Sequence, residues 1–360
     1  MGNKKITMCN YYGMCDANSN VMGHTCKVTK EYNELLSGQY TVSLMASPCI
    51  VDALNGENFA TVSRLPYDIR VDESFSLKKR IYDKIKLIRN LQECFCKTKD
   101  QILFFYQVDF FFFFYLALFY RQHSKKVYCL IFHQDFTGGS LEKLLGWFYR
   151  KALKKTDGVL YTQKGHPVEH PNTSWMPDYL YTPKRYLDYQ KLKKQEKMVC
   201  LGTMNRYKQL EELVEAFSQI QYPLEIIGRF DSVERFERLK QSASGNIRIE
   251  NKLLGEEEYY NIMGSAKFSI LPYDMTQYQS RTSGVLLESL YVGSVPVAPG
   301  QLLRQNELPG ICYESVSELK DMDWEGIPDH VIEKERELIL AEFGEERTVA
   351  AFENILSGNQ

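Results

Sequence analysis

Short apolar runs alternate with longer amphipathic stretches along the whole chain, which has 360 residues. This alternation is typical of β-α-β units, in which buried parallel strands are joined by helices. In the second half, the predicted strands are 198–201, 224–228, 246–250 and 267–271. The predicted helices there are 210–220, 232–242 and 256–263. The pattern therefore indicates a parallel sheet with helices on both faces.

The first half repeats this pattern less regularly. Its predicted strands are 5–8, 40–44, 101–107, 126–132 and 158–161, and its predicted helices are 21–36, 77–96, 110–121 and 140–153. Because a domain usually has roughly 100 to 200 residues, we expect two doubly wound α/β domains, residues 1–180 and 196–330. The proline-bracketed segment 177–197 is the predicted linker, and terminal helices are expected within 331–360.

Residues 102–120 are almost entirely apolar and include five consecutive phenylalanines. A bilayer-spanning helix needs about 20 such residues. Gln107 and Asp109 interrupt the run near its middle, which favours a buried strand followed by a crossover helix. A membrane-apposed aromatic face stays open for part of the segment.

The cysteines indicate a reduced protein, because they are scattered and show no C-x-x-C pair or zinc-type spacing. The N-terminus has no apolar signal segment, and Ile6 stands where myristoylation needs Ser or Thr. We therefore expect a cytoplasmic protein with structural thiols. The nine cysteines are Cys9, Cys15, Cys26, Cys49, Cys94, Cys96, Cys129, Cys200 and Cys312.

Charge is distributed unevenly between the two halves. Residues 1–195 contain 28 Lys and Arg against 18 Asp and Glu, and the remainder contains 16 against 28. The positive half is expected to bind an anionic partner such as acidic lipid or a phosphorylated carrier. The alternative is that its lysines simply lie on solvent-exposed helix faces. Nucleic acid is disfavoured, because basic and aromatic residues are not interleaved as in recognition modules. The basic residues concerned are Lys78, Lys79, Arg80, Lys84, Lys86, Arg150, Lys151, Lys154 and Lys155.

Residues 278–297 carry the most informative pattern. Ser283 is suited to cap a helix that starts near Gly284, and Gly293 is suited to end it before a short strand. Amide groups and the positive dipole end at a helix start bind phosphate, and a glycine there lets the anion approach closely. Glu288 lies one turn further along, where it could accept hydrogen bonds from ribose hydroxyls. The segment therefore predicts a nucleotide-binding helix start.

This segment resembles the donor-binding signature of retaining GT-B glycosyltransferases, the group 1 type found in bacterial polysaccharide biosynthesis. The residues that match the signature are Glu288, Gly293, Pro296 and Val297. The resemblance extends to residues 202–208, where Lys208 matches the family's lysine that clamps the donor diphosphate.

The chain departs from the family pattern at two positions. Ser280 stands where the family often has a first glutamate, and Thr203 replaces the arginine of the turn. Arg206 or Arg281 is expected to supply the missing charge, because an arginine fork suits a diphosphate. Lys208 and Arg206 are both expected to be exposed. The donor-binding residues that the resemblance implies are Gly23, Arg206, Lys208, Arg281, Ser283, Gly284, Val285 and Glu288.

In the first half, the resemblance rests on the Gly23-His24 helix start, on Asp109 after a strand, and on His133 and Asp135 at another strand end. Family members place a glycine loop against the donor phosphates, and catalytic or acceptor-side residues at these strand ends. Parallel α/β sheets also bind ligands at the carboxyl ends of their strands. The resemblance thus implies His133, Asp135 and Asp109 as catalytic candidates, although each could instead be structural.

The resemblance implies transfer of a sugar from a nucleotide-diphosphate donor to a glycan or lipid-linked acceptor, in a central cleft between two Rossmann-like domains. The acceptor would bind to residues 1–180 and the donor to residues 196–330, with peripheral contact to the inner face of an anionic plasma membrane. The resemblance also implies that one of the terminal helices within 331–360 could cross back to the first domain. Cationic side chains are expected to stabilise the leaving diphosphate, so neither a metal nor a cofactor beyond the nucleotide sugar is expected. A sugar-nucleotide epimerase, a glycan phosphorylase and a non-catalytic partner subunit stay open as alternatives.

Overall fold

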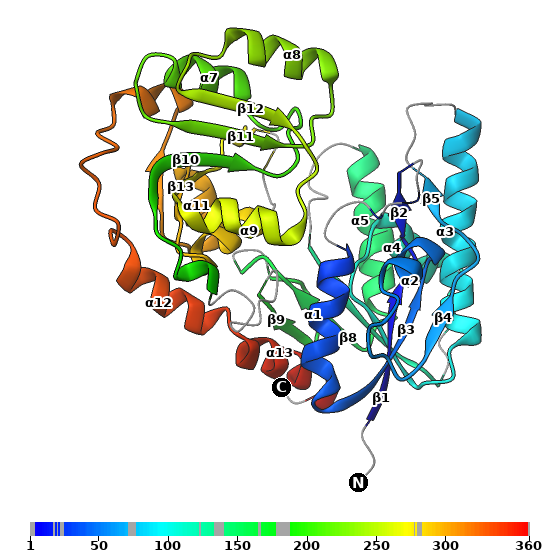
Figure 1. Ribbon diagram of the computed structural model, residues 1–360. Coiled ribbons are helices and arrows are strands. Elements are labelled where there is room, and N and C mark those ends of the chain that lie inside the picture. Colours follow the sequence, from blue (N-terminus) through cyan, green and yellow to red (C-terminus); the bar gives the residue numbers. More distant parts are fainter. Residues whose placement is uncertain are drawn as a thin grey trace. The chain divides into compact units, whose positions relative to one another are not determined.

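The computed structural model describes residues 4–16, 19, 21, 25–70, 77–121, 124–132, 140–164, 167–177, 188–276, 278 and 283–358. The chain divides into two compact units. Unit 1 comprises Met1–Leu180 and Glu345–Gln360, and unit 2 comprises Tyr181–Gly344. Each unit is built around its own parallel sheet (Figure 1).

Seven strands form the sheet of unit 1, in the order β4-β3-β1-β6-β7-β8-β9, and every neighbouring pair is parallel. The carboxyl ends of these strands therefore share one edge. The strands are β1 (Lys4–Asn10), β3 (Tyr40–Ala46), β4 (Val62–Arg64), β6 (Ile102–Phe105), β7 (Lys126–Ile131), β8 (Gly158–Tyr161) and β9 (Thr173–Trp175). A separate parallel pair consists of β2 (Met14–Cys15) and β5 (Ile69–Arg70).

Helices cover both faces of this sheet. They are α1 (Thr25–Ser37), α2 (Pro48–Ala53), α3 (Leu77–Lys97), α4 (Phe110–Leu118), α5 (Ser140–Leu153) and α13 (Glu345–Ser357). Phe104 and Phe105 illustrate the reason, because successive strand residues point to opposite faces. Phe105 packs on Phe112 of α4 with ring centroids 4.8 Å apart, and Phe104 packs on Phe352 of α13 at the same separation. The C-terminal helix therefore completes the core of unit 1.

Six parallel strands form the sheet of unit 2, in the order β12-β11-β10-β13-β14-β15. They are β10 (Gln195–Leu201), β11 (Leu224–Gly228), β12 (Ile247–Asn251), β13 (Ala266–Ile270), β14 (Val295–Pro299) and β15 (Ile311–Tyr313). The helices are α7 (Leu210–Phe217), α8 (Val233–Ser242), α9 (Glu256–Ser265), α10 (Gly284–Tyr291), α11 (Gly300–Asn306), the 3-10 helix η1 (Val316–Asp321) and α12 (Glu333–Glu342). Phe268 of β13 packs in the core against Tyr222 and Trp324.

These elements confirm the predicted α/β class with two parallel sheets. The apolar segment 102–120 forms β6 and α4, as its two polar residues indicate. In the described part of the chain, no helix combines the length and apolar character that crossing a membrane requires. Several boundaries differ from their predictions by a few residues. For example, β10 begins at Gln195, inside the predicted linker, and β6 ends at Phe105 rather than at residue 107.

Candidate functional site

Helix α10 begins near the carboxyl edge of the unit 2 sheet. Ser283 precedes it in an extended conformation (φ −119°, ψ 109°), and its Oγ accepts a hydrogen bond of 3.4 Å from the amide of Leu286. Gly293 follows the helix with a φ of +74°, which favours glycine. The predicted cap, helix and terminator are therefore confirmed. Gly284 is buried and Val285 half-buried in the first turn, where the helix dipole favours an anion.

The carboxylate of Glu288 lies inside the unit, with 1% of the residue exposed. Its Oε2 accepts a hydrogen bond of 2.7 Å from the hydroxyl of Tyr259, and its Oε1 accepts one of 3.0 Å from Tyr260. Both tyrosines belong to α9, and Tyr259 is the less buried of the two. Each carboxylate oxygen accepts more than one hydrogen bond, so Glu288 is a positioned acceptor with Tyr259 on its more accessible side.

Two glycines shape the turn that follows β10. Gly202 has a φ of +97°, and its carbonyl oxygen would lie 1.7 Å from a Cβ at position 228. Only a glycine at 228 therefore allows this approach of the two backbones. Beyond Gly202 the chain pairs with the segment after β11 through a parallel bridge between Met204 and Phe230.

The structure corrects the expectation that Lys208 is exposed, because only 5% of this residue is accessible. Its Nζ donates a hydrogen bond of 2.8 Å to the carbonyl oxygen of Leu201 and lies 3.8 Å from Sδ of Met204. Burial lowers the pKa of Lys208. The ammonium group is thus held at the carboxyl end of β10 rather than in solvent.

Tyr273 connects this turn with the start of α10. Its backbone pairs with that of Lys208 in an antiparallel bridge, and the Lys208 Nζ lies 5.8 Å from its ring centroid. The Tyr273 hydroxyl lies 3.4 Å from Oγ of Ser283. The ring stacks on Tyr278 with centroids 4.0 Å apart. The structure therefore brings together two of the predicted donor-binding residues, Lys208 and Ser283, through a tyrosine that the sequence pattern does not single out.

Arg206 is exposed as predicted, and its guanidinium donates a hydrogen bond of 3.3 Å to the hydroxyl of Tyr207. It lines a groove of about 480 Å³ at the start of α8. The other lining residues are Glu211, Asp231, Ser232, Glu234, Arg235 and Arg238. Arginines and acidic residues balance in this groove, and Arg235 pairs with Glu211 at 2.5 Å. The groove itself therefore has no excess positive charge for a diphosphate.

In unit 1, Asp109 is the N-cap of α4. Its Oδ1 accepts hydrogen bonds from the amides of Phe111 (2.9 Å) and Phe112 (3.3 Å) and from the hydroxyl of Tyr11 (2.5 Å). Burial raises the pKa of Asp109, and the hydrogen bond from Tyr11 opposes that shift. The cap explains an aspartate here without a substrate, so its catalytic role stays a prediction.

A polar cluster lies beside Asp109 at the carboxyl ends of β1 and β6. Oε1 of Gln107 accepts hydrogen bonds from Nδ2 of Asn10 and Oγ1 of Thr25, each 3.0 Å long. In the sequence, Gln107 interrupts an apolar run and Asn10 ends another, which are the signals of a polar strand end. Such an edge is suited to contact a hydroxylated ligand.

Four predicted site residues, Gly23, His133, Asp135 and Arg281, lie outside the described residues. Their roles stay predictions.

No protein-family model matches the chain, and no curated protein matches it in sequence. Solved structures match it over nearly their whole length. AviGT4, a glycosyltransferase involved in avilamycin A biosynthesis, aligns with a TM-score of 0.58 at 12% identity over 99% of this chain and 98% of its own. Anabaena Alr3699/HepE in complex with UDP and glucose aligns with a TM-score of 0.62 at 12% identity, over 98% of this chain and 99% of its own. Arabidopsis thaliana UGT89C1 complexed with UDP-L-rhamnose aligns with a TM-score of 0.61 at 13% identity, over 100% of both chains.

The chain has the GT-B fold. At these identities the likeness shows the architecture alone, and a fold does not specify chemistry. Within the GT-B fold, the function of this chain is therefore inferred from the capped start of α10, from Glu288 and from Lys208.

Proposed function

We propose that the protein is a glycosyltransferase that moves a sugar from a nucleoside-diphosphate donor to a glycan or lipid-linked acceptor. In this proposal the anomeric configuration is retained and the product belongs to a cell-surface polysaccharide. The observation that carries the proposal is the start of α10, where Ser283 is linked through Tyr273 to Lys208 and Glu288 lies one turn further along. The UDP and UDP-L-rhamnose bound to two of the similar structures support a nucleotide-sugar donor.

The donor would place its diphosphate at the amide groups of the first turn of α10. Its ribose would approach Glu288 from the side of Tyr259, because Tyr260 is buried and Tyr259 is only half-buried. We propose that a ribose hydroxyl takes the place of the Tyr259 hydroxyl on Oε2, while Tyr260 keeps the carboxylate in position. The two tyrosines would then have different effects on donor binding.

Transfer breaks the bond between the anomeric carbon and the diphosphate oxygen, so negative charge grows on the leaving group. A pre-positioned helix start and a desolvated cation stabilise such charge without reorganisation. Lys208 fits this role, because its ammonium is already buried and an adjacent anion would favour its charged form. In this mechanism, neither a metal nor a further cofactor takes part. His133, Asp135 and Asp109 are proposed for the acceptor side.

Contact with an anionic membrane is proposed for one face of unit 1, here called the α3–α5 face. It exposes five large apolar side chains, each 44% to 55% accessible: Ile81, Tyr82, Ile85, Leu144 and Trp147. Helix α4 lies between the other two, because Lys84 of α3 stands 4.0 Å from the ring of Phe111 and Phe114 packs on Phe148 of α5 at 5.2 Å. Apolar side chains among basic ones are typical of surfaces that bind acidic lipid.

The basic patch is smaller than the sequence predicts. Nζ of Lys155 donates hydrogen bonds to the carbonyl oxygens of Leu116, Ala117 and Tyr120, so it caps the end of α4. Unit 1 has 24 Lys and Arg against 20 Asp and Glu, and unit 2 has 20 against 26. The net charges of the two units, +4 and −6, therefore differ less than those of the two halves of the sequence, +10 and −12. The membrane proposal therefore depends on the local α3–α5 face.

A panel of labelled sugar nucleotides tests the proposed activity. A transferase should release nucleoside diphosphate in proportion to an added glycan or lipid-linked acceptor. Turnover of a sugar nucleotide without an acceptor would instead indicate the epimerase alternative, and release of a sugar 1-phosphate from a glycan and phosphate would indicate the phosphorylase alternative. A chain that binds none of the donors would be a non-catalytic subunit.

A further inference from the structure

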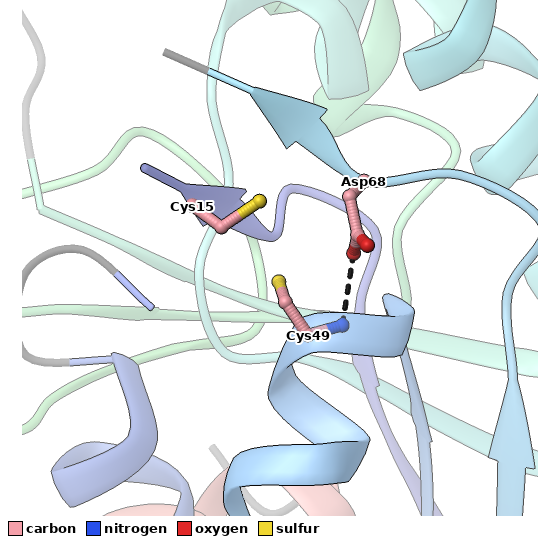
Figure 2. Close-up of side chains that lie close together, drawn as sticks. All are labelled: Cys15, Cys49 and Asp68. Carbon is pink, nitrogen blue, oxygen red and sulfur yellow. Dashed lines mark hydrogen bonds between the residues drawn. The ribbon is translucent and has the colours of Figure 1, made fainter. Parts of the chain in front are cut away.

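Two thiols and a carboxylate from three separate segments converge in unit 1. Cys15 ends β2, Cys49 lies in the first turn of α2, and Asp68 directly precedes β5. Their ligand atoms all lie within 4.8 Å of one another. In Figure 2 the sulfur of Cys15 points toward Asp68, and the sulfur of Cys49 points toward that of Cys15.

Backbone contacts fix these three segments before any ligand binds. The amide of Cys49 donates a hydrogen bond of 2.9 Å to Oδ1 of Asp68 (Figure 2). The pairing of β2 with β5 places Cys15 opposite Arg70. Gly13 lies against Cys49, since a Cβ at position 13 would be 3.2 Å from its sulfur. The thiols are buried, with 0% and 4% of Cys15 and Cys49 exposed, so their positions follow from the packing.

We propose that Cys15, Cys49 and Asp68 bind a divalent, thiol-preferring metal ion of which zinc is the physiological example. In a tetrahedral zinc site, the bond from the metal to sulfur is about 2.3 Å long and the bond to a carboxylate oxygen is about 2.0 to 2.2 Å long. Neighbouring ligand atoms of such a site are roughly 3.3 to 3.8 Å apart. The atoms here lie within 4.8 Å of one another, so each distance needs to shorten by at most about 1 to 1.5 Å. Oδ2 of Asp68 would be the oxygen ligand, because Oδ1 accepts the amide of Cys49, and water would take the fourth position.

Binding balances as a proton exchange. Each Sγ–H bond breaks, both protons go to the solvent, and the ion bonds to two thiolates and one carboxylate. No electron is transferred. The ion would cross-link β2, α2 and β5, and it would thereby fix the strand segment that follows Tyr11, whose hydroxyl contacts Asp109. The ion would thereby stabilise this part of unit 1, separately from the proposed donor chemistry.

Zinc alone, added to the reduced full-length chain and followed by dialysis, tests the site. We expect about one bound ion per chain, with release of protons into weakly buffered solution. Cys49→Ser and Asp68→Asn should each lower zinc affinity at least about tenfold. Asp68→Asn keeps an oxygen that accepts the amide of Cys49, so a folding defect does not obscure its result. Bound cobalt should give thiolate charge-transfer absorption that disappears in Cys15→Ser.

A matched control is Cys94→Ser, which alters another buried thiol of unit 1. Zinc binding should be unchanged in this variant. Two results would overturn the site: no zinc binding by the reduced wild-type chain, or equal loss of binding in Cys94→Ser.

Discussion

The hydroxyl of Tyr259 donates a 2.7 Å hydrogen bond to Oε2 of Glu288. This contact lies on the more accessible side of the carboxylate, and the hydroxyl of Tyr260 donates to its other oxygen, Oε1. If ribose replaces the Tyr259 hydroxyl, the carboxylate is needed for donor binding and the Tyr259 hydroxyl is not.

Glu288→Gln should therefore weaken donor binding by about 1.5 to 3 kcal/mol, the value of a hydrogen bond to a charged group. Tyr259→Phe should bind the donor as tightly as the wild type or more tightly. Calorimetric titration of both folded variants with the donor measures the difference. Equal weakening in the two variants would show that Glu288 and Tyr259 act as one structural pair and that ribose does not displace the tyrosine.

Lys208→Met should lower turnover strongly while keeping most of the buried volume. Unfolding should become easier by only about 1 kcal/mol, because one hydrogen bond to Leu201 is lost. Lys208→Ala should lose further stability, since it leaves a cavity. Steady-state kinetics and thermal unfolding separate the two effects. Wild-type turnover in Lys208→Met would remove the buried ammonium from the mechanism.

The cap at Asp109 allows its structural and chemical roles to be tested separately. Asp109→Ala should reduce the free energy of unfolding by about 1 kcal/mol, up to about 2, because the amides of Phe111 and Phe112 lose their acceptor. Asp109→Asn keeps an acceptor oxygen and should stay folded. If Asp109 takes part in the reaction, Asp109→Asn should lose activity as well. Full activity in that variant would leave Asp109 as a helix cap.

The α3–α5 face should bind vesicles that contain acidic lipid and should release them as the salt concentration rises. Salt shortens the range over which exposed charges attract, which is about 8 Å at physiological ionic strength. Trp147→Ser combined with Ile81→Ser should weaken the binding by removing exposed apolar area. Lys155→Met is a matched control, since that lysine caps α4. Sedimentation measures all three proteins. Equal retention on neutral and acidic vesicles at low salt would contradict a charge-dependent contact.

Local patterns predicted the elements well, because each depends on periodicity and capping within the segment. Helix α5 and strand β8 have the predicted bounds, and Ser283 caps α10 as its position before Gly284 indicates. The pattern found neither the short strand β9 nor helix α2. Their few residues carry too little periodicity, and tertiary pairing holds them in place.

The environments of the site residues could not be predicted in the same way. Tyr259 and Tyr260 reach Glu288 across 29 and 28 residues of sequence, and nothing local marks that contact. Lys208 follows a polar turn, which indicates exposure, yet only 5% of this residue is accessible and its Nζ lies 5.8 Å from the ring centroid of Tyr273. The three residues of the proposed metal site come from β2, from α2 and from the position before β5, so they lack the short spacing that identifies most zinc sites in a sequence.

Hydrogen exchange with and without a nucleoside diphosphate shows whether the start of α10 binds the donor diphosphate. The wild-type chain is titrated with UDP, GDP, ADP and dTDP, and exchange is measured for each ligand that binds. We expect at least one ligand to slow exchange in the first turn of α10, at residues 284–286, and in the turn at residues 202–208. Binding that protects neither segment, or no binding by any of the four, would contradict a diphosphate site at the start of α10.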